Sequence, residues 1–492
     1  MAITIIISFL LAVFTLAYLW IQRRYSFFAR LGVLHDKPKF PLGNMHGKTH
    51  PSEVFKQFYD KFCRKASAFG VYLFINPLFV ITDLDLAKDV LIRDFEAFHN
   101  RGAFYNKKDD PLSAHLLTIE DQEWKDMRNK LTPTFTSGKM RMYFSTLLEV
   151  SDRMIEKLKR NCDNIIEVKE MLAQYTTDVI GNVGFGLSIN AIDNPDTEFR
   201  RVGGKLFNKE TKFILRVALF ATFKNIARKL GLKLIPSDIT KFFMGVVKDT
   251  VNYRLENNIE RNDVLDTLMK IRDETQENEG KLTTEEIAAQ CFIFFVAGFE
   301  TSSTTGTLVL YNLVKYPEVQ EKLRDEIRTI LARHDNKITY EAMQEMKYLQ
   351  MVVDESLRIY PPIFQVLRQA ARDYKIEKDN FVIPKGSLVG VPVYAIHHDP
   401  EYYPEPHKFD PERFNDENKA NRHPMAFLPF GQGPRNCIGF RFGLMQTKVA
   451  LIQLLLNFRV HSSEKTPDPI KFDPDTATLS SENDMWLKFE KL

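Results

Sequence analysis

A helical pattern of more than thirty residues constrains the fold more than any other feature of the sequence. It opens at Thr283, where Glu286 three residues later completes a capping box, and it ends at Tyr316, because Pro317 cannot continue a helix. At about 1.5 Å per residue, such a helix is roughly 50 Å long and must cross a whole domain. Its middle, residues 292–306, is apolar on all sides. The pattern therefore predicts a buried central helix.

Small and polar residues interrupt the apolar centre of this helix. Gly298 costs about 1 kcal/mol relative to Ala, and the carboxylate of Glu300 needs a partner or a wet cavity. Ile293, Ala297 and Thr301 are four residues apart and therefore share one face. Small side chains there would let a bulky group approach the backbone, whereas a helix–helix crossing at Gly298 would explain the glycine alone. The helix by itself leaves both interpretations open.

The length of the chain and the lack of internal boundaries favour one large domain. The 492 residues would suit about three average domains, but no repeat, low-complexity tract or second linker follows residue 50. Helical patterns dominate, so we expect a mainly α fold with a small β region. The β-like runs lie near residues 71–74, 79–82, 374–376, 381–383 and 388–393. Lys and Arg total 67 against 64 Asp and Glu, which excludes a global basic surface for nucleic acid.

The N-terminus carries an uncharged apolar stretch over residues 2–21. Twenty residues span about 30 Å, the thickness of a bilayer core. Arg23, Arg24 and Arg30 follow the stretch and no basic residue precedes it, so the positive-inside rule puts the rest of the chain in the cytosol. A cleaved signal peptide is the alternative, but no basic n-region or small-residue cleavage site is visible. We predict a transmembrane signal anchor over 1–22 and a basic, proline-containing linker over 23–50.

One cysteine lies in a distinctive loop, Phe430-Gly-Gln-Gly-Pro-Arg-Asn-Cys-Ile-Gly439. Two glycines and a proline predict a tight loop, followed by a helix from about Gly439. Cys437 near a helix N-terminus feels the positive end of the dipole, which favours thiolate, a soft ligand for iron. A buried cysteine capping the helix is the alternative. The other cysteines are far apart and predict no disulfide framework; they are Cys63, Cys162 and Cys291.

A second pair of residues lies on a helix predicted from Thr339 to Tyr360. Glu355 and Arg358 are three residues apart and face each other across one turn. Taken alone, this is an ordinary helix ion pair. Arg413, in the sequence Pro-Glu-Arg-Phe, is available as a third member of a buried network.

The cysteine loop matches F-x-x-G-x-R-x-C-x-G and resembles the haem-binding loop of cytochrome P-450 monooxygenases. The other motifs follow the order of that family: Trp124-x-x-x-Arg128, Ala297-Gly-Phe-Glu-Thr301, the E-x-x-R pair and Pro411-Glu-Arg-Phe414. The resemblance covers the whole chain, anchor included. Residues 295–301, 398–404 and 427–431 are similar to insect microsomal members of the clan that includes vertebrate drug-metabolising enzymes.

The resemblance implies haem b, with Cys437 as the proximal ligand in a haem-thiolate catalytic domain over residues 51–492. Phe430 would shield the sulfur, and Gly433 and Gly439 would let backbone pass close to the porphyrin. Ala297 and Gly298 would leave room for the cofactor on the distal helix. The residues expected to hold the haem propionates are Arg435, Arg128, Trp124, Arg368 and Arg101.

The resemblance also assigns roles on the distal side. Glu300 and Thr301 match an acid–alcohol pair that delivers the protons with which one oxygen atom leaves as water. Glu355, Arg358 and Arg413 match a structural salt-bridge network. The residues expected to line the substrate pocket are Ile293, Val296, Ala297, His115, Leu116, Ile363, Phe364, Val366 and Leu479.

The implied function is a membrane-anchored monooxygenase on the cytosolic face of the endoplasmic reticulum. It would insert one atom of O2 into lipophilic xenobiotics, plant toxins, insecticides, hormones or fatty acids, with electrons from NADPH-cytochrome P-450 reductase and with cytochrome b5 as a further candidate partner. A reductase-independent haem-thiolate isomerase or dehydratase and a non-enzymatic haem sensor are the alternatives. The basic residues expected to dock the reductase are Lys125, Arg128, Lys130, Lys139, Arg141, Arg435, Arg441 and Lys448.

One further segment, residues 213–236, is basic, amphipathic and rich in aromatic residues. Such a segment dips into a membrane surface or packs on the core as a solvated helix pair, and its sequence does not decide between the two.

Overall fold

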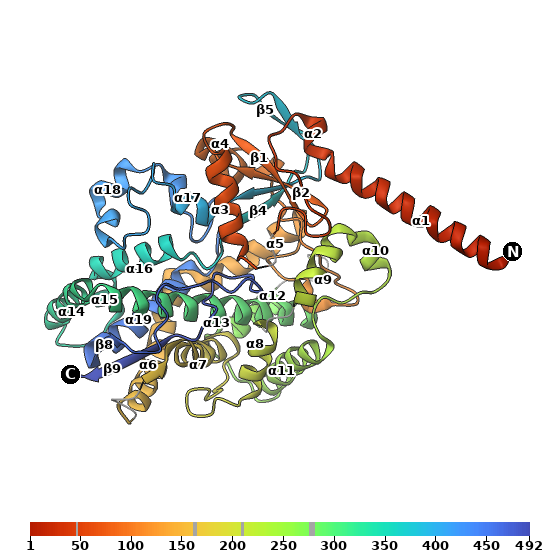
Figure 1. The fold of residues 1–492 in the computed structure, drawn as a ribbon. Helices are drawn as coiled ribbons and strands as arrows, with labels where there is room; N and C mark the ends of the chain where they lie inside the picture. Colours follow the sequence, from red (N-terminus) through yellow and green to blue (C-terminus); the bar gives the residue numbers. More distant parts are fainter. Residues whose placement is uncertain (46–47, 161–164, 208–210, 275–280) are drawn as a thin grey trace.

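A central helix, α13 (Thr284–Lys315), crosses the body of the protein in the computed structural model, which describes residues 1–45, 48–160, 165–207, 211–274 and 281–492 (Figure 1). Thr283 caps it through both hydrogen bonds of the predicted capping box, and Tyr316 is its C-cap. Its central residues are buried, among them Phe295 and Phe299. The prediction of a buried central helix is confirmed.

Helices surround α13 and make up most of the chain. In addition to α13 they are α1 (Ala2–Tyr25), α2 (Phe27–Leu31), α3 (Pro51–Phe62), α4 (Leu84–Lys88), α5 (Asp121–Leu131), α6 (Ser137–Arg160), α7 (Val168–Ile180), α8 (Glu198–Phe207), α9 (Thr211–Thr222), α10 (Lys224–Lys229), α11 (Ser237–Glu256), α12 (Val264–Glu274), α14 (Pro317–Ala332), α15 (Tyr340–Glu345), α16 (Lys347–Ile359), α17 (Val393–His397), α18 (Asp416–Asn421) and α19 (Phe440–Asn457).

The strands form small sheets at the edges of the helical body. One sheet has the order β1-β2-β7-β4, with β2 and β7 parallel and the other pairs antiparallel; a second has the order β3-β9-β8; and β5 pairs with β6. The strands are β1 (Ala68–Leu73), β2 (Asn76–Ile81), β3 (Ile165–Glu167), β4 (Val366–Gln369), β5 (Tyr374–Ile376), β6 (Phe381–Ile383), β7 (Leu388–Val391), β8 (Phe458–Ser462) and β9 (Trp486–Lys491).

The five predicted β-like runs all occur as strands, but β3, β4, β8 and β9 were not predicted. Each of the four owes its conformation to distant pairing: β4 pairs with β7, and β9 pairs with both β3 and β8. β8 also follows α19 without a loop, so its residues read as a continuation of the helical pattern. Short strands of this kind depend on tertiary contacts more than on propensity.

The helix predicted from Thr339 to Tyr360 is wrong in one respect, because it is broken into α15 and α16 at Met346. The break has a distant cause. The carboxylate of Glu326 on α14 accepts hydrogen bonds from the backbone N–H groups of Tyr348 and Leu349, at 2.6 and 2.8 Å. A carboxylate at this position caps the N-terminus of α16 and favours a new helix start.

The N-terminal helix α1 projects away from the body, and none of its residues is buried (Figure 1). It is long and apolar enough to cross a membrane; α13 also passes that test, but it is largely buried. The segment after α1 packs against the four-stranded sheet. Phe28 is fully buried, with its ring 5.1 Å from the rings of both Tyr72 and Phe79.

Candidate active site

The loop that carries Cys437 is tightly folded. The backbone N–H of Cys437 donates to the carbonyl oxygen of Phe430 at 2.9 Å, and that of Asn436 donates to Gly433 at 3.0 Å. Gly433 has a φ of +77°, and a Cβ added to it would overlap the carbonyl oxygen of Leu91. Only glycine satisfies both conditions at this position. Helix α19 begins directly after the loop, with Gly439 as its N-cap, as the sequence predicts.

The side chain of Cys437 lies deep in the protein and still has accessible surface. Burial raises the pKa of its thiol, while a hydrogen bond from the Gly439 backbone and the charges of Arg128 and Arg101 act in the opposite direction and favour thiolate. A side chain that is surrounded by protein yet accessible faces an interior surface. Cys437 is therefore placed to bind a group held inside the protein.

The central helix contributes a second part of this interior surface. Ala297 is exposed in the middle of α13, although Phe295 and Phe299 on either side of it are buried. Ile293 and Thr301, which share its face, are half-buried. The predicted face of small residues is thus accessible from within the molecule.

Gly298 lies where α13 crosses α7, which matches the second of the two interpretations that the sequence left open. A Cβ added to it would lie 2.6 Å from Cδ1 of Ile180 on α7, and its carbonyl oxygen accepts a hydrogen bond from Gln446 at 3.0 Å. Gly298 is thus explained by the crossing of α13 and α7, whereas Ala297 faces the interior surface. The two interpretations that the sequence left open apply to neighbouring residues.

Three arginines gather near Cys437 from distant parts of the chain: Arg368 and Arg435 are buried, and Arg101 is half-buried. Arg101 donates to the carbonyl oxygen of Arg435 at 2.9 Å, Arg435 donates to that of Ile119 at 2.7 Å, and Arg368 donates to that of Leu367 at 2.9 Å. Each retains at least one buried guanidinium N–H with no acceptor among the described residues. Trp124 contributes its ring face, which lies 4.3 Å below the Arg435 guanidinium.

These three guanidinium groups destabilise one another. Burial lowers the pKa of Arg435 to about 9 and that of Arg101 to about 10, and it lowers the pKa of Arg368 well below its ordinary value. The charge of Arg101 further lowers the pKa of both other arginines. Buried cations with free N–H groups suit an anionic ligand that accepts several hydrogen bonds. The two carboxylates of a haem fit this requirement.

Arg128 forms hydrogen bonds to the cysteine loop, which could not be predicted from the sequence. Its two terminal nitrogens donate to the carbonyl oxygen and the side-chain oxygen of Asn436, both at 2.9 Å. Asn436 precedes Cys437, so Arg128 braces the cysteine loop directly. Asn436 carries no sequence signal of its own, because the family motif leaves this position unspecified.

Glu300 and Thr301 are neighbours in sequence but face different surroundings. The Thr301 hydroxyl donates to the carbonyl oxygen of Ala297 at 2.6 Å, on the interior face. The carboxylate of Glu300 is buried and pairs with Lys169 of α7 at 2.9 Å. Successive residues of a helix point about 100° apart, which explains the divergence. Lys169 was not singled out from the sequence, since a single lysine in a helix forms no motif.

The residues predicted to line the substrate pocket differ in burial and in the elements that they contact. Ile293 and Val296 are half-buried on α13, and Val366 lies beside Gly431 of the cysteine loop. Leu116 donates its N–H to Gln290 at 2.9 Å, and His115 is buried beside Phe292. Ile363 is exposed, and Leu479 is fully buried.

Phe364 does not share this environment. It packs in an apolar cluster with α3 and the four-stranded sheet, with its ring 6.0 Å from that of Phe55 and 5.4 Å from that of His50. Phe364 therefore belongs to the sheet-side core, and its prediction as a pocket residue is not supported by its position.

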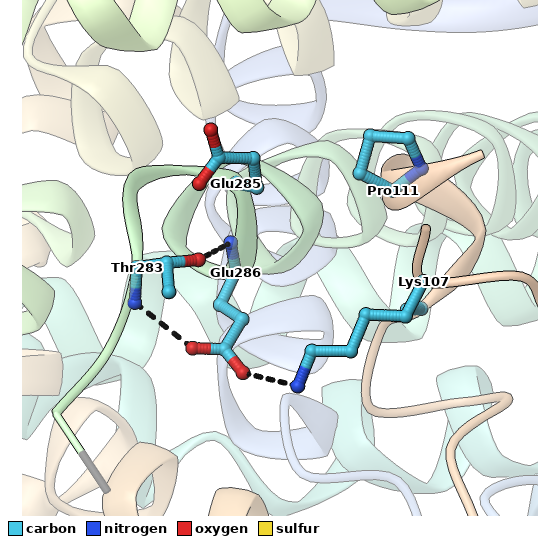
Figure 2. A pocket seen from close by; sticks show the side chains of 6 residues that line it. Lys107, Pro111, Thr283, Glu285 and Glu286 are labelled. Carbon is cyan, nitrogen blue, oxygen red and sulfur yellow. Dashed lines mark hydrogen bonds and ion pairs between the residues drawn. The ribbon is translucent and has the colours of Figure 1, made fainter. Parts of the chain in front are cut away.

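The start of α13 is fastened to the segment that carries His115 and Leu116. Lys107 pairs with Glu286 at 2.7 Å and with Glu123 at 3.1 Å, beside a cavity of about 160 Å³ (Figure 2). Figure 2 shows that Glu286 joins this ion pair to the Thr283 capping box, whose two hydrogen bonds measure 2.9 and 3.1 Å. One carboxylate therefore caps the helix and holds the neighbouring segment.

Glu355, Arg358 and Arg413 meet as the sequence predicts. Arg358 donates to both carboxylate oxygens of Glu355, at 2.7 and 2.8 Å, and Arg413 lies 3.4 Å from the same carboxylate. Glu355 and Arg358 have no exposed surface. Arg358 also donates to the carbonyl oxygen of His397 at 2.9 Å, and the ring of His397 accepts the N–H of Leu428 at 2.9 Å. The network thus reaches the segment that leads into the cysteine loop.

Two of the basic residues predicted to dock a partner are buried. Arg435 and Lys448 are 2% and 6% exposed, and burial lowers the pKa of Lys448 to about 8. Lys448 lies on α19, where it faces the carboxylates of Asp354 and Glu326. The charge pattern alone could not separate these from surface residues. The remaining predicted residues are exposed or half-buried; they are Lys125, Arg128, Lys130, Lys139, Arg141 and Arg441.

The chain matches the family model described as Cytochrome P450 over residues 36–487. It is 42% identical to "Probable cytochrome P450 6a14" of Drosophila melanogaster, with 97% of each chain covered, and 44% identical to "Probable cytochrome P450 6a23" of the same species, with 96% of each covered. It is 38% identical to "Cytochrome P450 6A1" of Musca domestica, over 97% of this chain and 96% of that one. The resemblance to insect members is confirmed, and the chain belongs to the cytochrome P450 family of haem-iron oxidoreductases.

Proposed function

We propose that this protein is a membrane-anchored haem-thiolate monooxygenase that uses haem b. The observation that carries the proposal is the accessible Cys437 side chain beside Arg101, Arg368 and Arg435, whose buried N–H groups lack acceptors among the described residues. Two propionates would accept hydrogen bonds from these arginines, and the thiolate of Cys437 would bind the iron. Arg128 and Gly433 would hold the cysteine loop in position.

A bound haem would supply the activation of dioxygen, and the thiolate of Cys437 would favour it by donating electrons to the iron. In the overall reaction, R–H, O2, NADPH and one H⁺ give R–OH, H2O and NADP⁺. One oxygen atom therefore needs two electrons and two protons to leave as water. Thr301 lies on the interior face and has a hydroxyl that can pass a proton, and Glu300 is the nearest acid along the helix.

The substrates that suit this site are lipophilic. Ile293 and Val296 offer apolar surface beside Ala297 on α13, and Leu116 meets the same helix at Gln290. This fits xenobiotics, plant toxins, insecticides, hormones and fatty acids as classes. Helices α9 and α10 support access from a membrane, because Phe223 between them stacks on Trp20 of the anchor helix at 5.9 Å. Exposed apolar side chains follow on this segment, at Leu219, Ile226 and Leu230.

The proposed location is the endoplasmic reticulum membrane, with the catalytic domain in the cytosol. Helix α1 would span the bilayer, and Arg23, Arg24 and Arg30 at its inner end would set the orientation. Electrons would come from NADPH-cytochrome P-450 reductase, with cytochrome b5 as a further candidate partner. The exposed Lys125, Arg141 and Arg441 would contribute a basic docking surface, so electron transfer should slow as salt rises.

The first test is the spectrum of the reduced, CO-treated protein. We expect the absorption band specific to thiolate-ligated haem in the wild type and in the Cys291→Ala variant, and its loss in Cys437→Ala. Cys291 is a matched control, because it is a fully buried cysteine on α13 with the same chemical change. A thiolate-type band in Cys437→Ala would contradict the ligand assignment.

The second test is turnover with a panel of lipophilic compounds, chosen by their binding difference spectra. With reductase, NADPH and ¹⁸O2, the product should carry one labelled oxygen atom. Thr301→Ala should release more hydrogen peroxide for each NADPH oxidised. Turnover of a hydroperoxide without NADPH would instead indicate an isomerase or dehydratase, and haem binding without any NADPH oxidation would indicate a sensor.

A further inference from the structure

Three buried polar side chains lie where α7 and α19 pack against the middle of α13. On α7 they are Tyr175 and Thr176, which are 1% and 2% exposed, and on α19 it is Gln446, which has no exposed surface. Burying a polar group is unfavourable unless the group is hydrogen-bonded. The stability of this part of the core therefore depends on the hydrogen bonds that these three side chains make.

Gln446 and Thr176 bind neighbouring carbonyl groups of α13. Nε2 of Gln446 donates to the carbonyl oxygen of Gly298 at 3.0 Å, and the hydroxyl of Thr176 donates to that of Phe299 at 3.2 Å. Successive residues of a helix are turned by about 100°, so the two donors hold α13 from different sides. The helix cannot rotate about its axis at this point without losing at least one of these bonds.

A third hydrogen bond joins the two outer helices. The hydroxyl of Tyr175 on α7 donates to the backbone carbonyl oxygen of Gln446 on α19 at 3.2 Å. The contacts therefore run from α7 to α19, from α19 to α13, and from α13 back to α7. A buried network of this kind favours one arrangement of the three helices, because a shift of any helix breaks a bond to another.

Gly298 lets α7 come close enough for this network. Ile180 lies one turn after Thr176 on the same face of α7, and its Cδ1 would be 2.6 Å from a Cβ added to Gly298. The backbone of α13 thus contacts α7 at the residue before Phe299. This close approach brings the Thr176 hydroxyl within reach of the Phe299 carbonyl oxygen.

The two bonded carbonyl groups belong to the turn that faces the interior surface. Ala297 precedes Gly298 and is exposed on that surface, and Thr301, one turn later, donates to the carbonyl oxygen of Ala297 at 2.6 Å. The rotation of α13 about its axis therefore decides which way Ala297 and Thr301 face. Gln446 also lies on the helix that begins directly after the cysteine loop.

We propose that Gln446 and Thr176 are positioning residues that fix the rotation of α13, so that Ala297 and Thr301 face the haem. The inference rests on the proposed haem-thiolate function and adds two residues that act through the backbone of α13. Gln446 further ties this turn to the helix that follows Cys437, so the cysteine loop and the turn keep a constant spacing.

Loss of either bond should let the turn open and rotate more often. Amide hydrogen exchange measures such local openings and needs no turnover. In the purified full-length protein, we expect the peptide over residues 294–306 to exchange about fivefold faster in Gln446→Leu and in Thr176→Val, the factor that corresponds to one typical hydrogen bond. In the reduced, CO-treated protein, the infrared C–O stretching band should shift in the same two variants, because the groups that face the CO have moved.

The competing explanation is that these bonds only stabilise helix packing. For Thr176, the matched control is the next residue on α7. Thr177 is also buried and donates to the carbonyl oxygen of Ala173 in its own helix at 2.7 Å. Thr177→Val therefore deletes the same hydroxyl without removing a bond to α13, whereas Thr176→Val deletes the bond to Phe299.

For Gln446, the matched control lies two turns later on α19. Gln453 is buried and donates to the side chain of Asp152 on α6 at 2.6 Å. Gln453→Leu therefore removes a comparable link between two helices, but one that does not reach α13. We expect Thr177→Val and Gln453→Leu to leave both the exchange of residues 294–306 and the C–O band at their wild-type values.

Conservative variants complete the experiment. Thr176→Ser keeps the hydroxyl, and Gln446→Glu keeps a donor because a buried carboxyl group beside a carbonyl oxygen stays protonated. Both variants should restore the exchange rate and the position of the C–O band. Urea unfolding of every variant shows how far each one is destabilised.

The proposal is overturned if Gln446→Leu and Thr176→Val match their controls in both readouts. It is also overturned if exchange quickens while the C–O band stays in place, because the bonds would then only stabilise packing. Wild type that lacks the thiolate-specific band would instead overturn the proposed function, and the exchange comparison does not depend on that band. The two failures are therefore distinguishable.

Discussion

The guanidinium group of Arg435 lies over the indole ring of Trp124, with 4.3 Å between its Cζ and the ring centroid. One terminal nitrogen donates to the carbonyl oxygen of Ile119, while Nε and the other terminal nitrogen are buried without an acceptor among the described residues. Stacking fixes the plane of the guanidinium and directs its remaining N–H groups. With Arg101 and Arg368 it forms a cationic cluster in which burial and mutual repulsion lower the pKa values of Arg368 and Arg435.

This cluster predicts opposite effects on the protein with and without haem. Arg368→Met removes a buried charge that has no ion-pair partner among the described residues, so the free energy of unfolding of the haem-free protein should rise by about 1–3 kcal/mol. The haem content after purification should fall, because one of the donors that we propose for the propionates is lost. Urea unfolding of haem-free protein and pyridine-haem content measure the two effects.

The matched control for this prediction is Arg254→Met. Arg254 is equally buried, but it donates to both carboxylate oxygens of Asp263, at 3.0 and 2.7 Å. Its removal leaves that carboxylate with only a longer ion-pair contact of 3.8 Å to Arg261, and it should therefore destabilise the haem-free protein. If Arg368→Met destabilises it as much, the cluster is not a binding site for an anion.

Gly433 should tolerate no side chain. Gly433→Ala combines a φ of +77° with an overlap on the carbonyl oxygen of Leu91, so the cysteine loop must shift. Gly386→Ala is the control, since Gly386 has a φ of +83° and open space around its Cβ position. We expect Gly433→Ala to lower the free energy of unfolding by about 2 kcal/mol more than Gly386→Ala and to reduce haem content. Equal effects in both variants would mean that the overlap is relieved at no cost.

Removal of Glu355 alone should lower the free energy of unfolding more than removal of Glu355 together with Arg358. Glu355→Leu leaves the buried Arg358 without its carboxylate and should cost about 3–5 kcal/mol. The double variant Glu355→Leu, Arg358→Met removes both charges and should cost less than the single variant. Thermal unfolding of the wild type, Glu355→Leu, Arg358→Met and the double variant measures this; a double variant whose loss equals the sum of the two single losses would contradict it.

His397 should make stability depend on pH. Burial lowers the pKa of His397 to about 3, and the charge of Arg358 lowers it as well. A histidine whose pKa is lowered on folding stabilises the protein fully above its unfolded pKa, near 6.5, and this contribution is lost as the pH falls toward 3. Between pH 6.5 and 5 the wild type should lose about 2 kcal/mol more than His397→Gln, at about 1.4 kcal/mol per pH unit.

Urea unfolding in detergent at both pH values measures this difference. His50 and His115, whose pKa values burial also lowers, are present in both proteins and cancel in the comparison. Equal slopes for the wild type and His397→Gln would contradict the prediction.

The elements that were predicted correctly are those with local signals. The capping box at Thr283 and the proline after Tyr316 delimit α13, and the glycines around Cys437 fold the loop before α19. The break at Met346 was missed because its cause, the Glu326 carboxylate, lies on another helix. Strand β4, which carries Arg368, was missed because its conformation depends on pairing with β7.

The class of fold, the family and the cysteine proposed as the haem ligand could be inferred from the sequence alone, because each is encoded by residues close together in the chain. Which side chains meet from far apart became clear only in three dimensions. Lys169 reaches Glu300 across two packed helices, Arg101 and Arg368 join Arg435, and Lys448 is withdrawn from the surface. Such contacts follow from how apolar faces pack, and the spacing of residues within one segment does not report the side chains on the segment packed against it.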